Sequence, residues 1–140
     1  CVLMFDLDHF HNINGTFGHE GGDLALAAFA TFVQQQIRPT DLFGRYGGEE
    51  FCALLIEADL AQGGQVAERL RSGVAALTVD VGQRQVHLTV SIGIALLRAG
   101  DFQAAIRDAD AALFQAKEQG RNRVVAASDA VAAVAVAASA

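Results

Sequence analysis

Short apolar runs alternate with helix-like apolar stripes along this chain, and this alternation constrains its fold more than any other feature. Strands are expected where apolar residues are continuous or alternate with polar ones, and helices where they recur every three or four positions. The strand-like runs cover residues 1–5, 41–46, 51–56, 79–81, 86–97 and 124–125, and the helical stripes cover residues 20–37, 59–77 and 102–116. Pro39 and Gly120 mark the expected ends of the first and third helices.

The order strand, helix, hairpin, helix, strand, helix, strand predicts an α/β (α+β) fold of the ferredoxin-like or palm type with a βαββαβ core. A central antiparallel sheet with flanking helices would form, and a turn through residues 14–18 would lead into the first helix. In such a sheet the first strand lies antiparallel beside the second strand of the hairpin. The acids that end the first strand, Asp6 and Asp8, are then expected at the hairpin tip. Glu49 and Glu50 occupy that tip.

Composition limits the classes of partner. The 140 residues are 52% hydrophobic and carry 10 basic against 16 acidic side chains, which predicts one compact acidic domain. Lys and Arg form no cluster, which argues against a nucleic-acid polymer as partner. Cys1 and Cys52 fit no metal-ligand spacing and are too few to staple a secreted scaffold, so a reducing compartment is favoured. No apolar run approaches the roughly 20 residues of a membrane span.

Four carboxylates at one edge of a sheet would repel one another strongly in a site of low dielectric. The arrangement therefore makes physical sense chiefly around a cation. Ligands that are all oxygen favour Mg²⁺, which typically serves phosphoryl transfer on nucleotides. Acids at strand ends and hairpin tips are also common as solvated loop residues. Spacing alone leaves both interpretations open.

The residues around these acids favour the first interpretation. Residues 47–51 read GGEEF, a form of the signature of the GGDEF family of diguanylate cyclases. Further blocks resemble that family in order and spacing: residues 6–10, Asn14, Gly18-His19, Gly22-Asp23, Ser91-Ile92-Gly93 and 110–122. Because these blocks extend over nearly the whole chain, it is identified as a member of this family.

The resemblance implies a nucleotidyltransferase of bacterial second-messenger signalling. Two GTP molecules would be condensed into cyclic di-GMP with release of two pyrophosphates, each 3′-hydroxyl attacking the α-phosphorus of the other GTP. One protomer would supply half of the site, so a homodimer would be needed for catalysis.

The resemblance also assigns metal and catalytic roles. Asp6, Glu49 and the carbonyl of Leu7 would hold Mg²⁺, with Mn²⁺ as the alternative cofactor. Glu50 would activate the 3′-hydroxyl. Asp8 would share in metal binding or in proton transfer, and residue types do not separate these two roles.

Contacts to the substrate follow from the same resemblance. Asn14 and Asp23 would bind the guanine edge, whose donors and acceptor suit a carboxylate and an amide. Lys117 and Arg121 are four residues apart, hence expected on one helix face, and would hold the terminal phosphates. A solvated basic face is the alternative for that pair. The other expected phosphate or ribose contacts are His9, Phe10, His11, Gly47 and Gly48.

A second site is implied ahead of the GGEEF signature. Arg38 and Asp41 have the spacing of the family's RxxD site, which binds cyclic di-GMP and inhibits catalysis. Arg69 resembles the arginine that completes this product site, with Arg71 as its competitor. A helix-terminal Arg followed by a turn Asp is the structural alternative for the first pair.

The chain also departs from the family pattern. His11 replaces the usual Lys near the phosphates, Gly15 replaces an Asp, and the family's leading helix is absent. We therefore expect a GGDEF domain at residues 1–127 of a longer protein with an upstream sensory or receiver domain, and a low-information Ala- and Val-rich tail at residues 128–140. The expected location is the bacterial cytoplasm, including the cytoplasmic part of a membrane-associated signalling protein.

Two other functions remain as alternatives. A catalytically silent GGDEF domain would act as a receptor for cyclic di-GMP or GTP, and a lost signature would favour it, whereas this chain retains one. A palm-type nucleotidyl cyclase or polymerase-like enzyme would share the paired carboxylates and the metal. The GGEEF turn and the guanine-binding pair argue against that third function.

Overall fold

The computed structural model describes residues 1–128. The strands of the main sheet are β1 Val2–Leu7, β2 Leu42–Gly47, β3 Glu50–Leu54, β6 Val90–Ala95 and β7 Val124–Ala126. The helices are α1 Phe10–Gln36, α2 Leu60–Ala75 and α3 Phe102–Glu118, and a separate two-stranded sheet is formed by β4 Thr78–Val81 and β5 Arg84–His87. The predicted tail at residues 128–140 lies outside the described residues, apart from Ser128.

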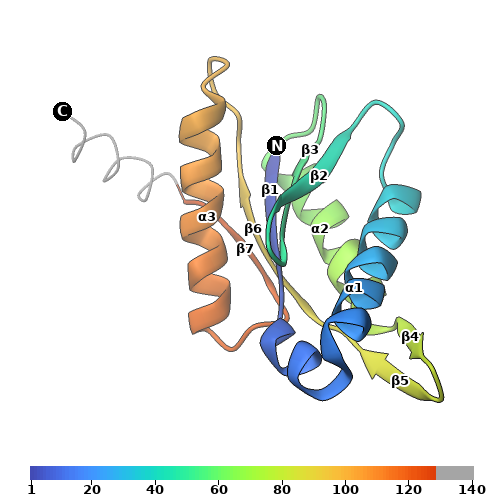
Figure 1. Ribbon diagram of the computed structural model, residues 1–140. Helices are drawn as coiled ribbons and strands as arrows, with labels where there is room; N and C mark the ends of the chain where they lie inside the picture. Colours follow the sequence, from blue (N-terminus) through green and yellow to red (C-terminus); the bar gives the residue numbers. More distant parts are fainter. Residues whose placement is uncertain (129–140) are drawn as a thin grey trace.

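The main sheet has the strand order β2-β3-β1-β6-β7. Its neighbouring strands are antiparallel except for β6 and β7, which are parallel. The predicted fold class, a central sheet with flanking helices, is therefore confirmed (Figure 1). The predicted neighbour of the first strand is confirmed as well, because β1 pairs antiparallel with β3.

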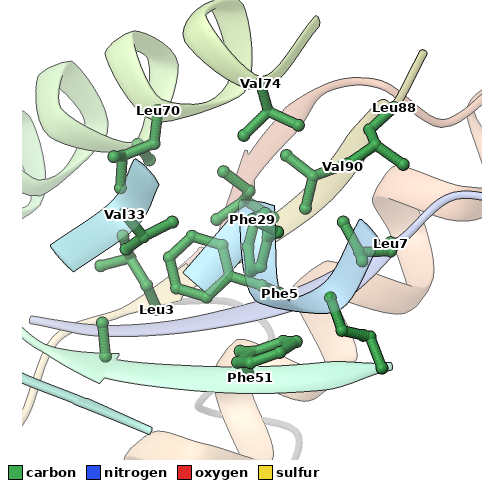
Figure 2. Packing of buried hydrophobic residues seen from close by; sticks show 14 of the residues in the cluster. Leu3, Phe5, Leu7, Phe29, Val33, Phe51, Leu70, Val74, Leu88 and Val90 are labelled. Atoms are coloured by element: carbon green, nitrogen blue, oxygen red, sulfur yellow. The ribbon is translucent and has the colours of Figure 1, made fainter. Parts of the chain in front are cut away.

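Helices cover both faces of this sheet, with α1 and α2 on one face and α3 on the other (Figure 1). Phe5 of β1 belongs to the core that also holds Phe29 of α1 and Leu70 of α2 (Figure 2). Met4, the next residue along the strand, belongs to the core with Leu113 of α3. Because alternate residues of β1 pack into opposite layers, the strand is apolar at every position except Asp6, as expected of a strand covered on both faces.

The first helix begins earlier than predicted. The expected turn at residues 14–18 is wrong: α1 begins at Phe10, and only Gly18 leaves the helical conformation, with φ 74° and ψ 174°. The reversal after β1 is made by His9, whose φ is 54°. Asn14 therefore lies on a helical segment before the kink, and Asp23 lies on the segment after it. The kink changes the direction of the helix between these two side chains.

The predicted long strand at residues 86–97 is divided in the structure. β5 pairs with β4, and β6 pairs with β1 and β7 in the other sheet. The residues between them, Leu88 and Thr89, belong to neither strand. The backbone carbonyl of Thr89 accepts a hydrogen bond from the amide of Asp8 at 2.9 Å. The alternation of apolar residues continued across this break, so periodicity alone could not place it.

Among residues 1–128, no helix is both long and apolar enough to cross a lipid bilayer.

Candidate active site

The carboxyl end of β1 places two acids beside the β2–β3 hairpin. Asp6 lies opposite Glu50 in the β1–β3 register, and the amide of Leu7 donates to the carbonyl oxygen of Glu49 at 3.3 Å. Only 7% of Asp6 is exposed. The Nζ atom of Lys117, near the end of α3, pairs with Oδ2 of Asp6. Three elements therefore meet at this end of the sheet.

Burial raises the pKa of Asp6 above its usual value. The negative charges of Glu49 and Asp8 add to that effect, and the hydrogen bond and positive charge of Lys117 oppose it. The pKa of Glu50 is also raised, first by burial and then by the charges of Asp6 and other acids. The β1–β3 register gives the physical reason, because it brings the carboxylate of Asp6 beside the acids of the hairpin tip, where like charges repel.

A hydrogen bond between a side chain and the backbone stabilises the hairpin tip. Gly48 has a φ of 51°, a conformation that favours glycine, and its carbonyl oxygen accepts a hydrogen bond of 2.7 Å from Nε of Arg45. A Cβ atom on Gly47 or Gly48 would meet no atom within 4 Å, so both positions leave open space beside the acids. Sequence reasoning missed Arg45, although its place two residues before the double glycine was a signal for a tip contact.

A cleft of about 270 Å³ opens at this end of the sheet. Most residues predicted for metal, phosphate or ribose contacts line it: Asp6, Leu7, Asp8, His9, Phe10, His11, Glu49, Lys117 and Arg121. Asn12 also lines it and was not predicted. The amino-terminal end of α1 borders the cleft, and a helix amino terminus favours anionic groups. Glu50 and Gly47 are not part of this lining.

A neighbouring cavity of about 340 Å³ shares Phe10, His11 and Glu49 with the cleft. It is lined further by Asn14, His19, Asp23, Leu26, Arg45 and Gly48. The predicted guanine-binding pair is therefore brought together, next to the predicted phosphate contacts.

The position of Asn14 depends on Gly22. A Cβ atom on Gly22 would overlap Oδ1 of Asn14 and lie 3.2 Å from the ring of Phe10. The glycine thus makes room for the amide side chain across the kink of α1. This gives a physical reason for a glycine directly before Asp23.

Lys117 and Arg121 reach the cleft by different routes. α3 ends at Glu118, and Arg121 follows it with a φ of 64°. The prediction that the two residues share one helix face is therefore wrong, because Gly120 ends the helix between them. Both side chains nevertheless line the same cleft. Two cations therefore oppose its acids.

Asp8 is held by hydrogen bonds from residues outside the hairpin. Its Oδ1 accepts a hydrogen bond from the hydroxyl of Ser91, and its Oδ2 accepts from the hydroxyl of Thr89, each at 2.7 Å. The backbone amide of Asn122 also donates to Oδ2, at 3.0 Å. Asp8 is 6% exposed. Hydrogen bonds therefore use both of its oxygens.

The oxygen atoms available at this end of the sheet are of the kind that binds a hard divalent cation. Carboxylate and carbonyl oxygens are what Mg²⁺ binds, together with substrate phosphates and water. Within residues 1–128, no three His, Cys, Asp or Glu side chains are arranged closely enough to hold a metal ion by themselves. Asp6 is instead paired with the ammonium group of Lys117. The protein thus offers a partial oxygen site at which one carboxylate already binds a cation.

A separate cavity of about 280 Å³ is lined by Arg38, Asp41 and Arg69. Burial alone would raise the pKa of Asp41, but hydrogen bonds from the amide of Ile56 and from Arg38 outweigh it and lower the pKa. Arg69 donates to the carbonyl of Gln36 at 2.8 Å. The structure thus brings the three predicted residues together. Arg71 lies elsewhere and is not part of this lining.

Comparison with known proteins gives consistent results. The family model described as "Diguanylate cyclase, GGDEF domain" matches residues 1–123. A probable diguanylate cyclase, DgcT of Escherichia coli strain K12, is 40% identical over 129 residues, which is 89% of this chain and 28% of that protein. The chain therefore spans less than a third of that relative's length.

Two solved structures are similar in fold. The diguanylate cyclase SiaD of Pseudomonas aeruginosa, in complex with its activator SiaC, matches with a TM-score of 0.86 and 40% identity, over 90% of this chain and 49% of SiaD. The coiled coil and GGDEF domain of DgcB from Caulobacter crescentus, in complex with c-di-GMP, match with a TM-score of 0.85 and 30% identity. That match covers 91% of this chain and 69% of the DgcB chain.

Proposed function

The chain belongs to the GGDEF-domain family of diguanylate cyclases, and on that premise we propose that it condenses two GTP molecules into cyclic di-GMP and two pyrophosphates. The observation that carries this proposal is the register of β1 and β3, which places Asp6 opposite Glu50 and beside the backbone of Glu49. Burial and mutual repulsion raise the pKa values of Asp6 and Glu50. Such acids suit a site for a metal and a polyphosphate.

In this proposal Asp6, Glu49 and the carbonyl of Leu7 hold Mg²⁺ or Mn²⁺. When bound, the metal neutralises triphosphate charge and polarises the reacting phosphorus. Glu50 accepts the proton of the 3′-hydroxyl that attacks, and its raised pKa brings it nearer to the working pH of a general base. Asp8 belongs to the site as a buried acceptor at its edge.

The neighbouring cavity binds the base. The carboxylate of Asp23 accepts hydrogen bonds from guanine donors, and the amide of Asn14 satisfies a guanine acceptor. His9, Phe10, His11 and the two glycines of the hairpin tip contact phosphate or ribose. Lys117 and Arg121 hold the terminal phosphates, with Arg121 offering a planar fork to their oxygens.

Two copies of the chain face each other during turnover, because each GTP supplies the 3′-hydroxyl for the other. The cavity lined by Arg38, Asp41 and Arg69 binds cyclic di-GMP as a feedback inhibitor. Two guanidinium groups at its wall support this, since arginine both pairs with phosphate and stacks on bases. In a longer protein, an upstream domain would control the meeting of the two copies.

The test is to incubate the concentrated chain with GTP and Mg²⁺ and to measure cyclic di-GMP and pyrophosphate by chromatography and mass spectrometry. A Glu49→Ala/Glu50→Ala double variant is the control. We expect product from the wild type and none from the variant. Binding of cyclic di-GMP without turnover, even in a longer dimeric form of the protein, would instead identify a receptor.

A further inference from the structure

The turn between α3 and β7 carries Arg121 in a backbone conformation that needs support. Arg121 and Asn122 have φ values of 64° and 46°. Both lie in the left-handed region, which asparagine tolerates but arginine seldom adopts. Such a conformation persists only where surrounding contacts hold it. The start of α1 and this turn lie at the same end of the sheet (Figure 1). Two side chains from distant parts of the chain contact the turn.

Asp8 holds the backbone of the turn. Its Oδ2 accepts a hydrogen bond of 3.0 Å from the amide of Asn122. The hydroxyls of Thr89 and Ser91 also donate to this carboxylate, each at 2.7 Å. A buried carboxylate with three such donors is a rigid acceptor.

Arg71 holds the side chain of the same turn. Its Nη1 donates to Oδ1 of Asn122 at 2.8 Å, across 51 positions of the sequence. Its Nε donates to Oε2 of Glu68 at 2.9 Å, and the two residues form an ion pair within α2. The side chain of Arg71 is 21% exposed. Glu68 therefore orients the guanidinium group, and the guanidinium group orients Asn122.

We propose that Arg71 is a positioning residue for nucleotide binding: together with Asp8 it holds the turn so that Arg121 reaches the terminal phosphates. The choice of a nucleoside triphosphate as the ligand in this inference rests on the proposed function. Arg71 does not line the cleft, whereas Arg121 does. Its effect on the nucleotide must therefore pass through Asn122 and the backbone of the turn.

The test compares two ligands on the 140-residue chain with Mg²⁺ present. An unreactive triphosphate, guanosine 5′-(α,β-methylene)triphosphate, is measured against GMP by titration calorimetry. We expect Arg71→Met to weaken the triphosphate about tenfold, the size of one lost charge-assisted hydrogen bond, and to leave GMP unchanged. Asn122→Ala should behave in the same way. Arg107→Met, which removes an equal charge from an exposed site on α3, should change neither ligand.

A double-variant cycle separates positioning from general destabilisation. In an Arg121→Ala background, Arg71→Met should cause no further loss of triphosphate binding. An equal loss with and without Arg121 would overturn the proposal.

Hydrogen–deuterium exchange without nucleotide tests the hold on the turn independently. The segment 120–126 should exchange faster in Arg71→Met than in wild type, and unchanged exchange would overturn the positioning role. If the wild type bound no triphosphate, the proposed function would fail, and so would the assignment of a phosphate ligand to Arg121. The exchange measurement would still decide whether Arg71 holds the turn in place.

Discussion

Replacing Gly93 with alanine should separate α3 from the sheet. Gly93 lies in β6, and a Cβ atom there would overlap the carbonyl oxygen of Ala109 and the amide nitrogen of Leu113. It would also lie 2.9 Å from the Cα atom of Leu113, where ordinary contacts begin at 3.4 Å. All three are backbone atoms of α3, so no side chain can rotate away. The helix itself must withdraw by about one ångström or more.

The expected cost follows from this geometry. Overpacking of a well-packed core costs about 1–3 kcal/mol. An alanine in a strand interior recovers about 0.5–1 kcal/mol relative to glycine. We therefore expect a net loss of about 1 kcal/mol in the free energy of unfolding, equivalent to a fall in Tm of about 4 °C for a domain of this size. Lys117 lies one helical turn after Leu113, so the withdrawal should also weaken its contact with Asp6 and lower GTP turnover.

Urea unfolding followed by circular dichroism measures this loss, provided that the m-value stays constant. Gly64→Ala is the matched control, because a Cβ atom at this position of α2 meets nothing within 4 Å. That substitution should stabilise the protein by about 0.5–1 kcal/mol through helix propensity. If both variants unfolded at the wild-type midpoint, the close approach of α3 to β6 would not be a constraint on this fold.

Three further outcomes are expected. Asp41→Ala should cost about 1–3 kcal/mol, because two backbone amides lose their acceptor. The pKa of Asp41 in the folded state lies below its unfolded value of about 3.9. The stability that ionised Asp41 contributes is therefore complete above about pH 3.9 and is lost as the pH falls through the folded-state pKa. Urea unfolding should show the difference in stability between variant and wild type shrinking over that range. Gly22→Ala should raise the KM for GTP about tenfold by displacing the amide of Asn14, measured as initial rates of cyclic di-GMP formation. Lys117→Met should raise the pKa of Asp6 further, because Lys117 opposes the effect of burial, and so move the acidic limb of the pH–rate profile to higher pH.

The adjacency of the central acids could be predicted from sequence because it depends on topology alone. An apolar run followed by a helix and a hairpin leaves few places for the first strand, and the place beside β3 puts Asp6 next to Glu50. No side-chain geometry was needed for that step. The grouping of Arg38, Asp41 and Arg69 around one cavity came from the family resemblance instead.

The parts that failed depend on single backbone conformations. Asn14 and Gly15 suggested a turn, but both are helical, and the helix breaks at Gly18 instead. Spacing suggested one helix face for Lys117 and Arg121, although Gly120 already predicted that the helix would end between them. Residues four apart share a helix face only if both lie within the helix, so the helix end has to be located before the spacing is interpreted.

Ser91 and Gly93 show a different limit. The sequence marked them as part of a family block but gave neither a role. In the structure the hydroxyl of Ser91 donates to Asp8, and Gly93 admits the backbone of α3. Both roles are contacts with residues that lie far away in the sequence. A pattern in one strand cannot contain such information.

The ion pair of Lys117 and Asp6 explains how the buried acid of the cleft is tolerated before a nucleotide binds. Desolvation offsets much of the attraction in a buried ion pair, so the pair of Lys117 and Asp6 is a weak source of stability and needs another explanation. Asp6 without a cation would be a buried charge repelled by Glu49 and Asp8. Lys117 supplies that cation in the free protein. A nucleotide with its metal would bring a cation for Asp6 and phosphate oxygens for Lys117, so each could exchange its partner for a ligand atom without leaving a buried charge unpaired.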